Sequence, residues 1–242
     1  APMIPVVGFL TEARARFNLR ADRESGNHNA LQAVAFDYVN RHIYTNQITG
    51  TTDVYTNRYD LDGPYDQASL DYQNNNSSAM RKQSLAVEYK TDGSVKLWSS
   101  SEDNRHQLTR FDYTAEGDPA NVELYQIGDD GADERVWNVA ITDDQTRLVA
   151  QSGFVIRVYD FQAMIAGGAG DYSTNALYEF TTDVGAQGIT TEGDFLYIWN
   201  GLEAVGSPNV MTAYTIYGEK ALTVGDNPMG EADAATEGTG AA

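Results

Sequence analysis

The segment Gln32-Ala33-Val34-Ala35-Phe36 is the first of four similar stretches, and the spacing of these stretches decides the expected fold. The other three are Gln83-Ser84-Leu85-Ala86-Val87, Trp137-Asn138-Val139-Ala140-Ile141 and Gln187-Gly188-Ile189-Thr190-Thr191. The four align without gaps, and their first residues are separated by 51, 54 and 50 positions. A period of about fifty residues built from short strand-like segments is typical of radial β-sheet arrays. The sequence therefore predicts an all-β fold, a β-propeller.

Two further apolar or aromatic runs follow each of these segments. The second runs are residues 42–45, 95–98, 147–150 and 195–199, and the third runs are residues 58–61, 110–113, 158–161 and 213–216. They are rich in Val, Ile, Tyr, Phe and Thr, as half-buried strands require. Turn sequences such as Asp92-Gly93 and Gly193-Asp194 separate them. Helical signals are weak and limited to residues 12–19 and 160–165.

The ends of the chain bear on the number of blades, which is four or five, with five favoured. Residues 16–19 look like a third-strand run with no first or second strand before it. Residues 220–224 read as an outer strand of the fourth repeat. Propellers remove exposed sheet edges by letting one terminus complete the blade begun by the other. We therefore expect the N-terminal strand to close the ring, with the propeller spanning residues 1–227. Residues 228–242 form an irregular acidic tail, rich in Gly and Ala, that is either disordered or part of the closing blade.

The composition restricts the classes of partner. The chain has 16 Lys and Arg against 35 Asp and Glu, a net charge of −19. Such a surface repels nucleic-acid phosphates and anionic membranes, so neither is an expected partner. The absence of cysteine excludes disulfides and thiolate metal sites. No stretch contains the roughly 20 apolar residues of a membrane helix. Residues 3–10 lack the pattern of a secretion signal, so we expect a signal removed before Ala1 or export without one.

Three stretches of the repeats resemble a known group of propellers. They are Leu31-Gln32-Ala33-Val34-Ala35-Phe36-Asp37, Asn40-Arg41-His42-Ile43-Tyr44-Thr45 and Gln187-Gly188-Ile189. The group contains teichoic-acid biosynthesis protein C-like propellers, receptor-binding propellers of bacteriophage tail fibres and helveticin-like bacteriocins. The resemblance covers roughly residues 17–227, although Trp137 breaks the repeat and the C-terminal end is shorter than a full closing blade. It implies an extracellular module that recognises bacterial envelope polymers.

Three glutamines recur at the start of the first strands. Because first strands line the channel of a propeller, Gln32, Gln83 and Gln187 are expected around one axis. An amide there could bind a ligand as both donor and acceptor. The alternative is that these amides bond the backbones of neighbouring blades, since a buried amide needs partners.

The three tryptophans and one histidine are the other candidate ligand-binding residues. Trp98, Trp137 and Trp199 all lie within the repeats, where an exposed indole could stack on a sugar ring. The alternative is packing between adjacent blades. His28 precedes the first inner strand, where a loop at the channel mouth is expected, and its alternative is a surface turn residue.

Two acidic loops raise a hypothesis of calcium binding. The first surrounds Gly63 and the second surrounds Gly131; their acids are Asp60, Asp62, Asp66, Asp129, Asp130, Asp133 and Glu134. Neither loop has the spacing of a dedicated calcium loop, so solvated turns are the favoured interpretation. The three histidines share no short spacing, and no other metal or cofactor is predicted.

The chain has no nucleophile elbow, phosphate-binding loop or dinucleotide fingerprint, so we predict that it is not an enzyme. The favoured function is a receptor-binding or adhesion protein of a phage tail, extracellular or on the virion, which binds bacterial cell-envelope polysaccharide. Its expected partners are further copies of itself in an assembly and other virion proteins. The two alternatives are a structural docking hub, and a polysaccharide lyase or glycoside hydrolase that uses channel carboxylates.

Overall fold

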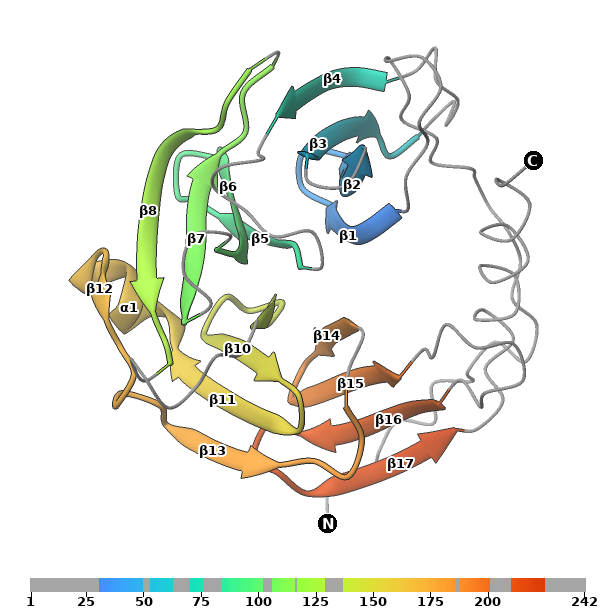
Figure 1. Ribbon diagram of the computed structural model, residues 1–242, viewed down its shortest axis with the longest axis vertical. Coiled ribbons are helices and arrows are strands. Elements are labelled where there is room, and N and C mark those ends of the chain that lie inside the picture. Colours follow the sequence, from blue (N-terminus) through green and yellow to red (C-terminus); the bar gives the residue numbers. More distant parts are fainter. Residues whose placement is uncertain are drawn as a thin grey trace.

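Four antiparallel sheets are arranged in a ring, and each sheet is one blade of a propeller (Figure 1). The computed structural model describes residues 31–49, 53–62, 70–75, 84–101, 106–115, 117–128, 137–185, 188–200 and 210–224. The predicted β-propeller is confirmed, and the four blades of this part of the chain fall within the predicted range. The predicted N-terminal strand and the tail lie outside the described residues, so closure by a fifth blade stays a prediction.

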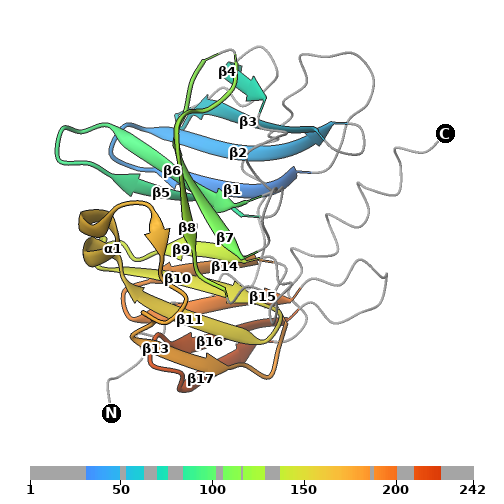
Figure 2. The same cartoon turned by 60° about the vertical axis from the view of Figure 1, so that its left-hand side comes forward.

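Each blade contains four antiparallel strands, and the first of them along the chain is innermost (Figure 1). Blade 1 is β1 (Leu31–Asp37), β2 (His42–Thr49), β3 (Asp53–Asp60) and β4 (Leu70–Asn75), and blade 2 is β5 (Ala86–Tyr89), β6 (Val95–Ser100), β7 (Gln107–Asp112) and β8 (Ala120–Gln126). Blade 3 is β9 (Asn138–Ile141), β10 (Arg147–Ser152), β11 (Val155–Asp160) and β13 (Tyr178–Thr181), and blade 4 is β14 (Gly188–Glu192), β15 (Phe195–Asn200), β16 (Val210–Thr215) and β17 (Lys220–Val224). The turned view in Figure 2 shows the four sheets in the same order.

The three apolar runs of each repeat form the three inner strands of each blade. The fourth strands lie at the outside of the ring and carry a weaker signal; β13, for example, exposes most of its residues (Figure 1). Only β17 was predicted among them, at the residues that the structure shows. An alternation of apolar and polar residues fades where neither face of a strand is deeply buried.

One short helix and a two-residue strand stand outside the four-strand pattern. The helix α1 (Phe161–Gly167) begins where a helical turn was predicted, and Asp160 caps it by accepting a hydrogen bond from the Ala163 N–H at 3.0 Å. It ends at Gly168, whose φ of +75° suits glycine. The strand β12 (Gly170–Asp171) then pairs in parallel with β8 of blade 2. None of the described helical residues forms a segment long and apolar enough to cross a membrane.

The hydrophobic cores lie between neighbouring blades rather than within one blade. Blades 1 and 2 share a core of Ala35, Tyr44, Leu85, Val87, Leu97 and Phe111. Blades 2 and 3 share the largest core, which includes Trp98, Leu108, Tyr125, Trp137, Leu148, Tyr159 and Phe161. Blades 3 and 4 share Val149, Ile156, Val158, Leu196, Ile198, Tyr214 and Ile216. Because each blade gives side chains to its neighbours, the positions of the inner strands depend on the whole ring.

Blade 2 also encloses a network of ions. Arg110 donates to Glu88 through Nε and Nη2 at 2.7 and 2.6 Å, and to Glu123 through Nη1 at 2.9 and 2.8 Å. Lys96 approaches Glu123 at 3.3 Å. Burial by itself would raise the pKa of Glu123, but hydrogen bonds from Arg110 and Tyr125 outweigh it and hold the pKa below its usual range. The Glu88 carboxylate is thus paired inside the blade, whereas Glu123, also paired with Arg110 and Lys96, is partly exposed.

Candidate functional site

A central cavity of about 860 Å³ lies between the first strands of the four blades. It is lined by residues of β1, β5, β9 and β14 and of the turns that follow β1 and β9. The sequence predicted that the first strands line the axis of the ring, and the structure confirms this. Most lining side chains are apolar, and the polar ones gather near the ends of the first strands.

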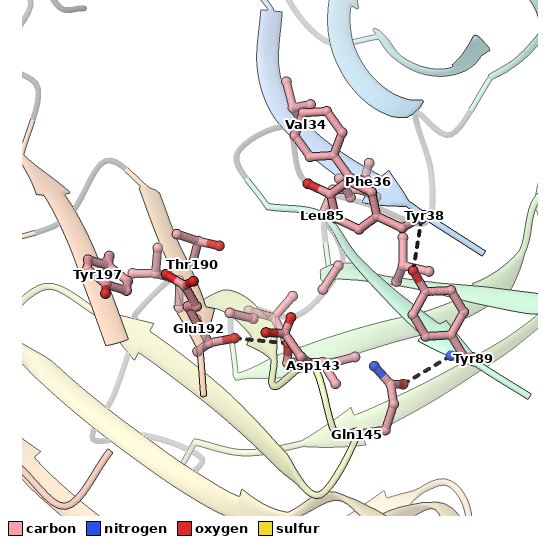
Figure 3. Close-up of a pocket in the computed structure, with 18 of the residues that line it drawn as sticks. Val34, Phe36, Tyr38, Leu85, Tyr89, Asp143, Gln145, Thr190, Glu192 and Tyr197 are labelled. Carbon is pink, nitrogen blue, oxygen red and sulfur yellow. Dashed lines mark hydrogen bonds between the residues drawn. The ribbon is translucent and has the colours of Figure 1, made fainter. Parts of the chain in front are cut away.

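The wall formed by β1 exposes a row of apolar and aromatic side chains to the cavity (Figure 3). Strand alternation places Val34 and Phe36 on one face, 36% and 37% exposed, whereas Ala35 and Asp37 are buried. Tyr38 follows the strand and is 65% exposed. The rings of Phe36 and Tyr38 are stacked, with centroids 5.7 Å apart and planes inclined by 9°. The pair forms a flat apolar platform with a phenolic hydroxyl at its edge.

Hydrogen bonds between blades hold this end of the cavity in place. The Tyr38 N–H donates to the Tyr89 hydroxyl at 3.1 Å, and the Tyr89 N–H donates to Gln145 Oε1 at 3.0 Å (Figure 3). Gln145 lies in the turn between β9 and β10 with a φ of +57°. Burial raises the pKa of Tyr89, so its hydroxyl stays uncharged and can accept this bond. Blades 1, 2 and 3 are therefore joined at the mouth of the cavity.

Blade 4 and the turn after β9 bring carboxylates to the same mouth. Thr191 of β14 donates to the Ile141 carbonyl of β9 at 2.9 Å. Glu192 comes directly after Thr191, and Asp143 comes two residues after Ile141, so both exposed side chains lie beside this bond (Figure 3). Among the described residues that line the cavity, none is Lys, Arg or His. The mouth therefore has a negative potential, and it combines carboxylates with an aromatic wall.

Ser84 connects the inner strands below the mouth. Its carbonyl accepts hydrogen bonds from Asn46 Nδ2 at 3.2 Å and from Ser99 Oγ at 2.6 Å. Its hydroxyl accepts from the Val139 N–H at 2.7 Å. The alternative role of the repeated glutamines was hydrogen bonding between neighbouring blades. Ser84, the residue after Gln83, makes such bonds. These hydrogen bonds hold the cavity wall in place without a ligand, so the site is preorganised.

The structure places the glutamines and the histidine as follows. Gln32 is half-buried, at a register shift in β1 between Leu31 and Ala33, and it does not line the cavity. Gln83, Gln187 and His28 lie outside the described residues. Sequence reasoning missed the residues at the ends of the first strands. The repeat did not point to them, because the first strands end at residues of different types, Asp37, Tyr89, Ile141 and Glu192.

The tryptophans do not line the cavity. Trp98 and Trp137 are 0% exposed. Trp98 donates to Glu88 at 2.8 Å, and its ring centroid lies 4.7 Å from that of Tyr125. The guanidinium carbon of Arg157 lies 5.1 Å from the Trp137 ring centroid. Trp199 of β15 is half-buried. Trp98 and Trp137 therefore offer no ring face to a sugar, and their positions match the packing alternative.

Metal binding finds no support in the part of the chain that the structure describes. There, no three His, Asp or Glu side chains are grouped as a metal site needs. Arg41 Nε donates to Asp62 at 3.2 Å, and this bond holds the pKa of the carboxyl below its usual range. Asp60 accepts a hydrogen bond from the Asp62 N–H at 2.8 Å. Asp66 of the first acidic loop and all four acids of the second lie outside the described residues, so calcium binding there stays a prediction.

Comparison with known proteins extends these findings at the level of fold. No model of a known protein family matches the chain, and no curated protein matches it. The tail fibre of Staphylococcus aureus phage P68 aligns with a TM-score of 0.62 at 18% identity, over 81% of this chain and 39% of that one. TolB from Acinetobacter baumannii aligns with a TM-score of 0.49 at 10% identity, over 80% of this chain and 43% of that one.

A periplasmic gluconolactonase of Pseudomonas aeruginosa aligns with a TM-score of 0.47 at 14% identity, over 85% of this chain and 59% of that one. The chain thus spans less than two thirds of each of these proteins. Identities this low concern the fold alone. The likeness to a phage tail propeller, which the repeats implied, is confirmed at that level, and the two weaker alignments carry no argument about function.

Proposed function

We propose that this chain is a non-enzymatic glycan-binding propeller of a phage tail fibre, which recognises bacterial cell-envelope polysaccharide at the mouth of its central cavity. The observation that carries the proposal is the exposed, stacked pair of Phe36 and Tyr38 inside a cavity whose rim is polar. The setting on a virion, outside the cell, is supported by the fold shared with the tail fibre of phage P68.

The chemistry of the mouth suits a sugar. A pyranose ring has an apolar C–H face and a rim of hydroxyl groups. The Phe36–Tyr38 platform offers a large contact area at low cost in side-chain entropy. Thr190, Glu192 and Gln145 line the same cavity and can donate to or accept from hydroxyl groups. A cavity of about 860 Å³ also lies within the usual range for small-ligand sites, roughly 300–1,000 Å³.

The first test is binding of a clustered, labelled form of the protein to an array of bacterial envelope glycans, wall teichoic polymers included. Clustering matters because many copies in an assembly turn weak single contacts into strong attachment. We expect saturable binding that falls by about tenfold in Tyr38→Ala, since aromatic anchors dominate such contacts. The matched control is Tyr217→Ala, an aromatic residue 53% exposed in the turn after β16 that does not line the cavity.

If Tyr38→Ala and Tyr217→Ala bind the glycans equally well, the binding site is not at the cavity mouth. If no array member is bound even by the clustered protein, the proposal is abandoned. The same samples are assayed for release of sugar fragments, and none is expected. Release that stops in Asp143→Asn, with binding retained, would instead establish a polysaccharide-cleaving enzyme.

A docking hub is the second candidate, and one observation favours it. Val122 and Leu124 of the outer strand β8 are 43% and 41% exposed, an unusual apolar pair on the side of a blade. A hub would bind a protein at this surface and would show no glycan binding at the cavity mouth.

A further inference from the structure

We infer that the mouth of the cavity selects glycans that carry an organic ammonium group; this inference rests on the proposed function. The ligand class is a saccharide or polyol polymer with free amines. Those amines could come from amino sugars or from aminoacyl esters, and the chemistry recognised is the same in both.

The geometry of the two mouth carboxylates is the first support. Asp143 and Glu192 belong to different blades, and the hydrogen bond from Thr191 to the Ile141 carbonyl fixes their strands side by side. Among the described residues, neither carboxylate has an ion-pair partner, and the cavity lining contains no Lys, Arg or His. This contrasts with Glu88 and Glu123, which Arg110 neutralises inside blade 2. The mouth is thus built to receive positive charge from outside the chain.

The wall opposite these carboxylates indicates which kind of cation fits. Phe36, Tyr38 and Tyr89 line the same cavity, and aromatic faces attract ammonium groups through their π electrons. A metal ion would need several oxygen ligands in one cluster, and no such group of three acids exists among the described residues. Carboxylates facing aromatic rings form an environment for an ammonium group attached to an organic skeleton.

The net charge of the chain also favours ligands that carry ammonium groups. At −19, the protein repels a polymer whose only charges are phosphates. Ammonium substituents on the polymer reverse the sign of the local interaction. A bacterial envelope polymer can be anionic overall and still carry positive charge at its ammonium groups. A protein that selects these groups can bind the polymer although both have a negative net charge.

The test compares two matched trisaccharides at about pH 6, where free amines are protonated. One is the β-1,4-linked trimer of glucosamine and the other is the same trimer with every amine acetylated. Affinities are measured by calorimetry for the wild type, for the double variant Asp143→Asn/Glu192→Gln and for Glu219→Gln. Glu219 is exposed in the turn after β16 and outside the cavity, so its variant reports the effect of losing one charge away from the mouth, where the double variant loses two charges at the mouth. A second arm compares an alanyl-esterified glycerol phosphate polymer with the same polymer after its esters are hydrolysed, which separates the two sources of amine.

We expect the free-amine trimer to bind about tenfold more tightly than the acetylated trimer, and we expect added salt to reduce that preference. The double variant should lose the preference, and Glu219→Gln should keep it. If both trimers bind equally while Tyr38→Ala still weakens them, the ammonium inference fails and the glycan site stands. A preference that survives in the double variant would reveal attraction to net charge only, and it would also overturn the inference. If no glycan binds at all, the proposed function fails together with it.

Discussion

At the scale of single residues, exposure separates two aromatic side chains that the sequence does not distinguish. Trp98 is 0% exposed, with its Nε1 bonded to Glu88 and its ring edge-on to Phe161 of α1, at 5.7 Å between the ring centroids. Tyr38 is 65% exposed and stacks on Phe36 in the cavity. An indole packed on every side stabilises the fold, whereas an open ring pair can bind a ligand.

Replacing Trp98 by Phe should therefore lower stability without changing the site. The change leaves a cavity in the core between blades 2 and 3 and removes one donor from Glu88, so we expect a loss of about 2–3 kcal/mol in the free energy of unfolding. Urea denaturation measures the loss, and glycan affinity of the folded protein should stay as in the wild type. Tyr38→Ala should show the opposite pattern, with stability within about 0.5 kcal/mol of the wild type. A drop in affinity for Trp98→Phe would mean that this core shapes the cavity.

At the scale of elements, contacts between strands of neighbouring blades set the geometry. One contact joins blades 3 and 4 at their outer strands. Asp183 follows β13, and it accepts hydrogen bonds from Lys220 of β17 and from the hydroxyl of Tyr214 on β16. The bond from Lys220, followed by that from Tyr214, holds the pKa of Asp183 below its usual range. Burial, followed by the bond to Asp183, raises the pKa of Tyr214 to about 12.

This contact should stabilise the blade pair above the pKa of Asp183 in the unfolded chain and lose its effect in acid. Because the pKa is lower in the folded state, the carboxylate binds protons less readily there, and its contribution fades as the pH falls through the folded pKa. The side chains of Lys220 and Asp183 are 44% and 57% exposed, so we expect Asp183→Asn to cost less than about 1 kcal/mol at pH 7. In thermal melts, the cost should begin to shrink below about pH 4 and vanish only once the pH is below the folded pKa of Asp183. If Asp183→Asn costs the same stability at both pH values, the effect comes from the geometry of the hydrogen bonds and not from the charge of the carboxylate.

At the scale of the whole molecule, the ring has no independent blade. Each of the three cores takes its side chains from two neighbouring blades. Removing a blade would expose the core face of each blade with which it shares a core, so the described blades support one another. Cooperative unfolding follows from this arrangement, because each blade that opens removes half of a core from a neighbouring blade.

We therefore expect one unfolding transition. Far-UV circular dichroism should report the loss of strands, and tryptophan fluorescence should report Trp98 and Trp137 in the core between blades 2 and 3 together with Trp199 on β15 of blade 4. The two curves in urea should coincide at one midpoint. Separate midpoints would contradict this cooperativity and would show that parts of the ring unfold independently.

The repeat period by itself determined the propeller, its inner strands and the strands that line the axis, because alternation and turn chemistry are local properties of a chain. It also identified β17 and the start of α1. Only the tertiary structure decided which side chains form the candidate site. Phe36, Tyr89, Asp143 and Glu192 lie on repeats about fifty residues apart, and they meet only because the ring turns the ends of four first strands toward one mouth. The burial of Trp98 and Trp137 was likewise decided by the neighbouring blade, since a strand pattern shows that a residue faces one side of a sheet but not what covers that side.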